Sequence, residues 1–180
     1  MSGIDDILKN LPIDQIASQL GVDAQTARTA IEQGGGAILS GLQKNASTSE
    51  GSAAIEAALG THAGTLANGV DLSAVDTADG EKILGHVFGG NQQEVAKTLT
   101  NDSKTAGIDF SQLLPILAPI VMGMLAKNQA SSSSSAGESS GGIGDLIGGL
   151  LGGLGGQSSG GSSGGFDIGG LIGGLLGGKK

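Results

Sequence analysis

Apolar positions recur every three or four residues along most of the first 130 residues, a period typical of amphipathic helices. Residues 45–52 and 100–108 are polar and are predicted to be loops, whereas residues 60–80 give only a weak signal. The pattern therefore predicts a chain of helices, which fall within residues 4–20, 23–44, 53–59, 81–88, 92–99 and from 109 or 111 to 125.

Helix-breaking residues interrupt this pattern at three places. Pro12 divides the first helical stretch, because proline lacks an N–H and clashes with the preceding turn. Gly34–Gly36 are expected to weaken or kink the second, since glycine is a poor helix former. Pro115 and Pro119 lie in the most apolar segment, Leu113 to Leu125, and are expected near helix starts or at kinks.

Short motifs recur in the same order in two halves of the first 130 residues. The pairs are Ile7–Leu8 with Ile83–Leu84, Ile16–Leu20 with Val95–Leu99, Gly21–Asp23 with Gly107–Asp109, and Leu42–Asn45 with Leu125–Asn128. Self-similarity of this kind indicates an internal duplication, in which two helical units pack face to face. The spacing between the pairs drifts and the motifs are short, so coincidence is the alternative.

The chain changes character after residue 128. Twenty of its 36 glycines follow Ala130, and the octapeptide Leu-Ile-Gly-Gly-Leu-Leu-Gly-Gly occurs twice, at 146–153 and 171–178. A Ser/Gly linker, residues 157–165, separates the two copies, and such linkers behave as flexible coil. The sequence thus predicts a helical domain over residues 1–128 and a disordered, low-complexity tail over residues 129–180.

The two octapeptides are the candidate interaction sites. As a helix, residues 143–156 would hold seven glycines, each costing about 1 kcal/mol relative to alanine. They would also hold six Leu or Ile side chains, each contributing about 2 kcal/mol when buried. The octapeptides are therefore expected to form two apolar patches, away from the body of the protein, that order only on burial. The side chains expected to carry this interaction are Leu146, Ile147, Leu150, Leu151, Leu171, Ile172, Leu175 and Leu176.

Several partners could bury these patches: a second copy of the chain, another protein or a membrane surface. The terminal Lys179 and Lys180 could meet anionic head groups, although two lysines contribute only about 2 kcal/mol. No run of 18 apolar residues is present, and the N-terminus does not resemble a secretory signal. The chain is therefore expected in the cytoplasm, with membrane association as an alternative. A disordered tether without a partner is the other alternative.

Residues 16–32 resemble a helix-turn-helix, with Gly21 in the turn and Asp23 as the N-cap of the second helix. The candidate recognition helix carries one base, Arg28, against Asp23 and Glu32. DNA binding needs several phosphate contacts from Lys or Arg, and the net charge of the whole chain is −8. A packed helix pair is therefore the favoured interpretation, and weak DNA binding is the second alternative function.

The sequence offers no catalytic constellation, cofactor motif or metal-ligand spacing. Cysteine is absent, and the two histidines, His62 and His86, have no carboxylates at ligand spacing near them. His86 is expected to be partly buried and satisfied within an apolar helix. The acidic residues around position 80 lack the spacing of a calcium loop and are expected to cap helices. No enzymatic activity, cofactor or small-molecule substrate is expected.

The segments Ile83–Gly89 and Leu113–Gly123, with the sequence Leu-Pro-Ile-Leu-Ala-Pro in the second, resemble the YidB-like bacterial proteins of domain-of-unknown-function family 937. The resemblance covers about residues 1–128 and implies an all-helical fold and a bacterial origin. It implies no activity and supplies no site residues. Together with the residue patterns, it predicts an all-α helical bundle that acts as a non-enzymatic structural or interaction protein.

Overall fold

The computed structural model describes residues 8–9, 11–62, 70–105, 107–134, 143–144 and 147–148. All regular structure in these ranges is helical, which confirms the predicted all-α fold. The longer helices are α2 (Ile13–Leu20), α3 (Ala24–Ala46), α4 (Ser49–His62), α5 (Thr77–Phe88), α6 (Gln92–Thr100) and α7 (Phe110–Ser134), with short 3-10 turns at η1 (Leu72–Ala74), η2 (Gly89–Asn91) and η3 (Ser103–Thr105).

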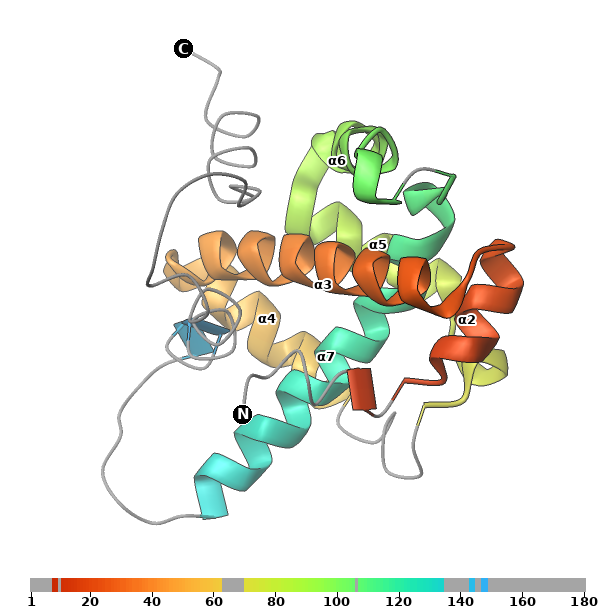
Figure 1. The fold of residues 1–180 in the computed structure, drawn as a ribbon. Coiled ribbons are helices and arrows are strands. Elements are labelled where there is room, and N and C mark those ends of the chain that lie inside the picture. Colours follow the sequence, from red (N-terminus) through yellow and green to blue (C-terminus); the bar gives the residue numbers. More distant parts are fainter. Residues whose placement is uncertain are drawn as a thin grey trace, which may run out of the picture.

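Helix α7 forms the centre of the bundle. It packs on four of the other helices, α3, α4, α5 and α6 (Figure 1). Phe110, Leu113 and Leu117 on α7 are completely buried. The segment Phe110–Ala130 is long and apolar enough to cross a membrane, but 78% of it is buried inside the fold. Its apolar composition is therefore accounted for by its place in the core.

Both prolines of α7 lie inside the helix rather than in its first turn. Pro119 has no N–H to donate to the carbonyl of Pro115, one turn earlier. This carbonyl lies against Gly80 of α5, where a Cβ atom would overlap Pro115 O and C. The backbone of α5 thus packs closely on α7 at the point where the hydrogen-bond ladder of α7 is interrupted.

Helix α3 runs without interruption through Gly34–Gly36, so the expected weak point or kink is not present. The three glycines are buried, and Gly34 faces α7. A Cβ atom on Gly34 would lie 2.8 Å from Leu117 Cδ1. Close packing of two long helices here offsets the low helix propensity of glycine, which packing commonly overrides.

Helices α4 and α5 each begin about four residues earlier than the apolar pattern predicts. The Asp76 carboxylate accepts hydrogen bonds from the N–H groups of Ala78 (2.9 Å) and Asp79 (3.1 Å), which starts α5 at Thr77. Asp71 caps η1 in the same way, through the N–H of Ser73 at 2.9 Å. Helix capping by the acidic residues near position 80 is therefore confirmed for Asp71 and Asp76.

The two predicted halves of the chain share a turn geometry. Gly21 precedes α3 with φ of 68°, and Gly107 precedes α7 with φ of 96°, a region that favours glycine. Two residues later in each case, an aspartate accepts a backbone hydrogen bond: Asp23 from Gln25 N at 3.0 Å, and Asp109 from Ser111 N at 2.9 Å. A short helix, a left-handed glycine, an aspartate cap and a long helix therefore recur in order, which supports the predicted duplication.

The aspartates of these two caps are expected to lower the free energy of unfolding when the pH becomes acid. A hydrogen bond from the Thr26 side chain lowers the pKa of Asp23 below 3.8, and one from Ser111 lowers that of Asp109. An aspartate whose pKa is lower in the folded chain than in the unfolded chain stabilises the fold above pH 3.8. This stabilisation is lost as the pH falls through the pKa of the folded chain. The double variant Asp23→Asn, Asp109→Asn should therefore show a smaller drop in unfolding free energy between pH 5 and pH 2.5, because asparagine also caps helices. Urea unfolding at both pH values measures the drop, with the double variant Asp14→Asn, Glu56→Gln at exposed positions as the control of equal net charge. An unchanged drop would contradict the assignment.

Candidate interaction site

Two positions of the tail lie against the helical body. Ile143 is 3% exposed and Ile147 is fully buried, and both belong to the same apolar core as the helices. The glycines that follow them face the end of α3: a Cβ atom on Gly144 would lie 3.9 Å from Ala46 Cβ, and one on Gly148 would lie 3.5 Å from Gln43 Nε2. In Figure 1 the short blue pieces lie beside the junction of α3 and α4. The body therefore has a surface that takes an Ile-Gly segment of its own tail.

Of the eight predicted interaction residues, Ile147 is the one that the structure describes. It is buried on the body, so at this position the expected apolar patch away from the body is not observed. The domain boundary expected at residue 128 falls within α7, which continues to Ser134. The predicted disorder of the tail concerns residues mostly outside the described ranges. The remaining seven predicted residues also lie outside them: Leu146, Leu150, Leu151, Leu171, Ile172, Leu175 and Leu176.

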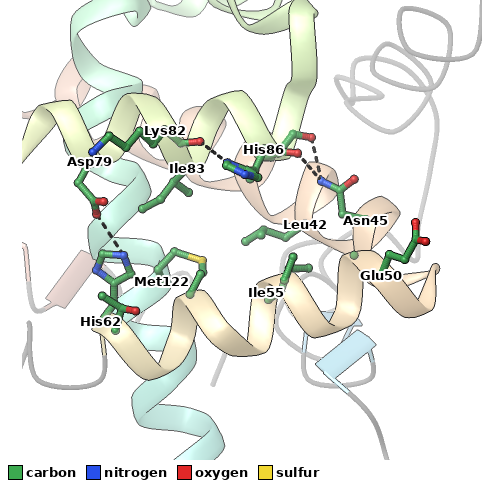
Figure 2. Close-up of a pocket in the computed structure, with 15 residues that line it drawn as sticks. Leu42, Asn45, Glu50, Ile55, His62, Asp79, Lys82, Ile83, His86 and Met122 are labelled. Carbon is green, nitrogen blue, oxygen red and sulfur yellow. Dashed lines mark hydrogen bonds and ion pairs between the residues drawn. The ribbon is translucent and has the colours of Figure 1, made fainter.

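A cavity of about 530 Å³ lies between α4 and α5, with Met122 of α7 among its lining residues. In Figure 2, Ile55 from α4 and Ile83 from α5 point into the same space as Leu42 and Met122. The volume is in the range of ligand sites, about 300–1,000 Å³. The α4–α5 pocket, as we call it, is lined by Leu42, Asn45, Glu50, Gly51, Ala54, Ile55, Ala58, Thr61, His62, Asp79, Lys82, Ile83, His86, Val87 and Met122.

Polar contacts close the two ends of the α4–α5 pocket (Figure 2). At one end His62 Nε2 lies 3.1 Å from Asp79 Oδ2 and ties α4 to α5. At the other, Asn45 Nδ2 donates to the carbonyl oxygens of His86 (3.0 Å) and Val87 (3.1 Å), which ties α3 to the last turn of α5. These contacts fix the spacing of the helices around the apolar space.

His86 is exposed, and the expectation of partial burial is wrong. Its Nδ1 lies 2.8 Å from the carbonyl oxygen of Lys82, so this nitrogen carries the hydrogen. The bond holds the ring along the surface of α5, where the apolar face of the helix ends. His62 does have a carboxylate partner, Asp79, which the sequence pattern does not reveal because 16 residues separate them.

The described residues contain no group of three or more His, Cys, Asp or Glu side chains that could hold a metal ion. The walls of the α4–α5 pocket are mainly aliphatic, and its polar groups are paired with one another or lie at the edge. An arrangement of this kind favours the burial of apolar groups over proton transfer or nucleophilic attack.

Three polar residues that the sequence pattern does not single out are buried, namely Gln33, Asp102 and Thr105. Asp102 is 7% exposed, and its Oδ1 accepts from Lys104 N at 2.8 Å. Its Oδ2 has no hydrogen-bond partner within the described part of the chain. Thr105 is completely buried nearby in sequence and contacts Gln33 of α3 at 3.4 Å. Asp102 orders the turn before α7 through this hydrogen bond to Lys104 N.

The helix-turn-helix segment is a packed pair. Ala27, Ala30 and Ile31 of α3 are buried, and α3 continues into the core. Its exposed N-terminal end carries Asp23 and a single base, Arg28. This placement favours the structural interpretation and gives no support to DNA binding.

The fold and these surfaces define a class: a small all-α bundle, built on a central apolar helix, that buries part of its own glycine-rich tail. Residues 4–128 match the model of a family of bacterial proteins of unknown function, DUF937, and the chain belongs to that family. No curated protein matches it. No solved structure matches it either.

Proposed function

We propose that this protein is a non-enzymatic interaction protein that self-associates through its Leu/Ile-Gly tail. The observation that carries the proposal is the burial of Ile143 and Ile147 on the helical body. The helical body has an apolar surface that binds one copy of the motif. A tail with two copies therefore has a second copy left to bind another chain.

The two copies are alike beyond the octapeptides. The first tail motif, residues 143–153, aligns with a second tail motif, residues 168–178, and they differ only in that Asp145 is replaced by Gly170. The equivalents of the buried Ile143 and Ile147 are Ile168 and Ile172. The second tail motif therefore carries the same apolar side chains and glycines that fit the first to the body.

The lengths of the connecting segments decide which motif binds its own body. Residues 135–142 connect α7 to the first tail motif, whereas residues 135–167 connect it to the second. The second connection is about four times as long, and loop-closure entropy then disfavours its intramolecular binding by about 1 kcal/mol relative to the first. The first tail motif accordingly binds within its own chain, and the second is left to bind another copy.

Sedimentation equilibrium of the full chain tests the proposal. Replacing Leu171, Ile172, Leu175 and Leu176 with serine should abolish oligomers, because each leucine or isoleucine contributes about 2 kcal/mol when buried. The matched control replaces four linker glycines, Gly160, Gly161, Gly164 and Gly165, with serine and leaves every apolar side chain in place. Oligomers of unchanged mass in the motif variant would contradict self-association.

Liposome flotation of the same variants separates self-association from membrane binding. Vesicles with anionic lipid offer the strongest attraction for Lys179 and Lys180. The proposal expects the protein to stay unbound and oligomeric in the presence of vesicles. Flotation that is lost in the motif variant, with no oligomers in solution, would replace self-association by peripheral membrane binding.

A further inference from the structure

We propose that the α4–α5 pocket receives the second tail motif, residues 168–178, of another copy of the chain. This inference rests on the proposed self-association and assigns it a surface. The second tail motif requires such a surface of its own, because Ile143 and Ile147 of the first motif already lie buried on the body.

The shape of the α4–α5 pocket suits a glycine-rich apolar segment. Its α4 side presents two small residues, Ala54 and Ala58, opposite the larger Ile83 and Val87 of α5. Small residues on one wall let a second backbone approach closely, and glycines in the motif allow the same from the other side. The leucine and isoleucine side chains of the motif would then fill the space above Met122.

The α4–α5 pocket also adjoins the surface that already holds the first tail motif. Leu42 and Asn45 line the pocket, and they alternate with Gln43 and Ala46, which face Gly148 and Gly144. The last turns of α3 thus separate two neighbouring apolar sites. One is occupied by the first motif, and the second motif has the same composition.

Charge distinguishes the two motifs in favour of the second. The lining of the α4–α5 pocket carries two acids, Glu50 and the His62-paired Asp79, against one base, Lys82, and residues 1–130 carry a net charge of −7. The second tail motif is followed directly by Lys179 and Lys180, and it has glycine at position 170 where the first motif has an acid. Opposite charges at the edge of an interface increase the association rate and select the partner.

The geometry of assembly follows from this placement. Each chain has one acceptor, the α4–α5 pocket, and one donor, its second tail motif, on different parts of the molecule. Such a contact closes as a two-fold dimer when two copies exchange their second tail motifs, and it produces larger rings or open chains of subunits when the exchange is not reciprocal.

Filling the α4–α5 pocket tests the inference in the full chain. Ala54 lines the pocket and is exposed, so Ala54→Trp should fill its opening without disturbing the core. Ala57→Trp, also exposed on α4 but outside the pocket, is the matched control. We expect at least a tenfold weaker association for Ala54→Trp and wild-type association for Ala57→Trp, by sedimentation equilibrium. Equal association of the two variants would overturn the assignment.

Disulfide trapping identifies the occupant directly, because the natural chain has no cysteine. Full chains carrying Ala54→Cys are mixed with full chains carrying Gly174→Cys, mildly oxidised and separated on a non-reducing gel. We expect a cross-linked heterodimer that forms at least five times more slowly when Ala57→Cys replaces Ala54→Cys. Equal cross-linking at positions 54 and 57 would overturn the inference.

The two proposals fail separately. If serine substitution of the second tail motif abolishes oligomers while Ala54→Trp does not, self-association stands and the α4–α5 pocket is not its acceptor. If the motif substitution leaves oligomers intact, the proposed function itself fails. A chain with both Ala54→Cys and Gly174→Cys that forms only the intramolecular disulfide would overturn binding between copies.

Discussion

Gly80→Ala is expected to destabilise the fold by about 3 kcal/mol or more, because it places a methyl group against the main chain of the central helix. The Cβ atom would overlap Pro115 O and C, which belong to the backbone of α7 and cannot rotate away as a side chain can. The variant therefore needs α5 and α7 to separate, and these helices form a major contact of the bundle. A loss of this size is a large part of a typical total stability of about 5–15 kcal/mol.

Gly85→Ala is the matched control for that prediction. Gly85 lies on the same helix, is exposed and has no atom within 4 Å of the position its Cβ would take. Alanine there should leave stability unchanged or raise it by up to about 1 kcal/mol, through its higher helix propensity. Urea unfolding of both variants measures the difference. A similar effect of the two substitutions would show that the close approach of Gly80 to Pro115 does not hold the bundle together.

The sequence predicts most of the helices because their apolar positions are regular and their caps are recognisable. Asp23, Asp76 and Asp109 each precede a helix and accept backbone hydrogen bonds where local chemistry places them. The continuity of α3 through Gly34 and of α7 through Pro115 could not be predicted in the same way. Both depend on packing between segments that are distant in the sequence, Gly34 against Leu117 and Pro115 against Gly80, which local propensity does not contain.

The candidate site, too, can be predicted from the sequence only in the part that depends on local residue patterns. The repeated tail motif is evident in the sequence, and the low helix propensity of its glycines leads directly to the expectation that it orders on burial. The surface that buries Ile147 is not evident, because the end of α3 meets the tail only in the folded chain. The α4–α5 pocket is likewise a product of tertiary structure, since its lining residues come from four separate helices.

The long helices α3 and α7 begin in the same way and pack closely on one another. Each follows a left-handed glycine and an aspartate cap, so each helix enters the bundle through the same local geometry. The two helices then contact one another through Gly34 and Leu117. This arrangement fits the expectation that two helical units pack face to face, with α4 between the two halves in the sequence.

Ile147→Ala and Ile172→Ala should have different consequences, although they change the same residue in two copies of one motif. Ile147 is fully buried on the body, and an isoleucine-to-alanine change in a core costs about 2–5 kcal/mol. We expect Ile147→Ala to release the first tail motif, with loss of hydrogen-exchange protection at residues 143–148 and a lower midpoint of thermal unfolding. The fall in stability is limited by the free energy with which the segment binds, because the helical body can remain folded once the segment has left.

Ile172→Ala should leave the thermal midpoint of the dilute, monomeric chain unchanged and weaken self-association instead. The reason is that residue 172 belongs to the motif assigned to another copy, so its burial contributes only when chains associate. Scanning calorimetry at low concentration and sedimentation at high concentration separate the two effects. The double variant should show both, because the proposal assigns the two positions to separate sites. Equal thermal shifts for the two single variants would mean that both motifs bind their own body, and assembly between copies would then lack a donor.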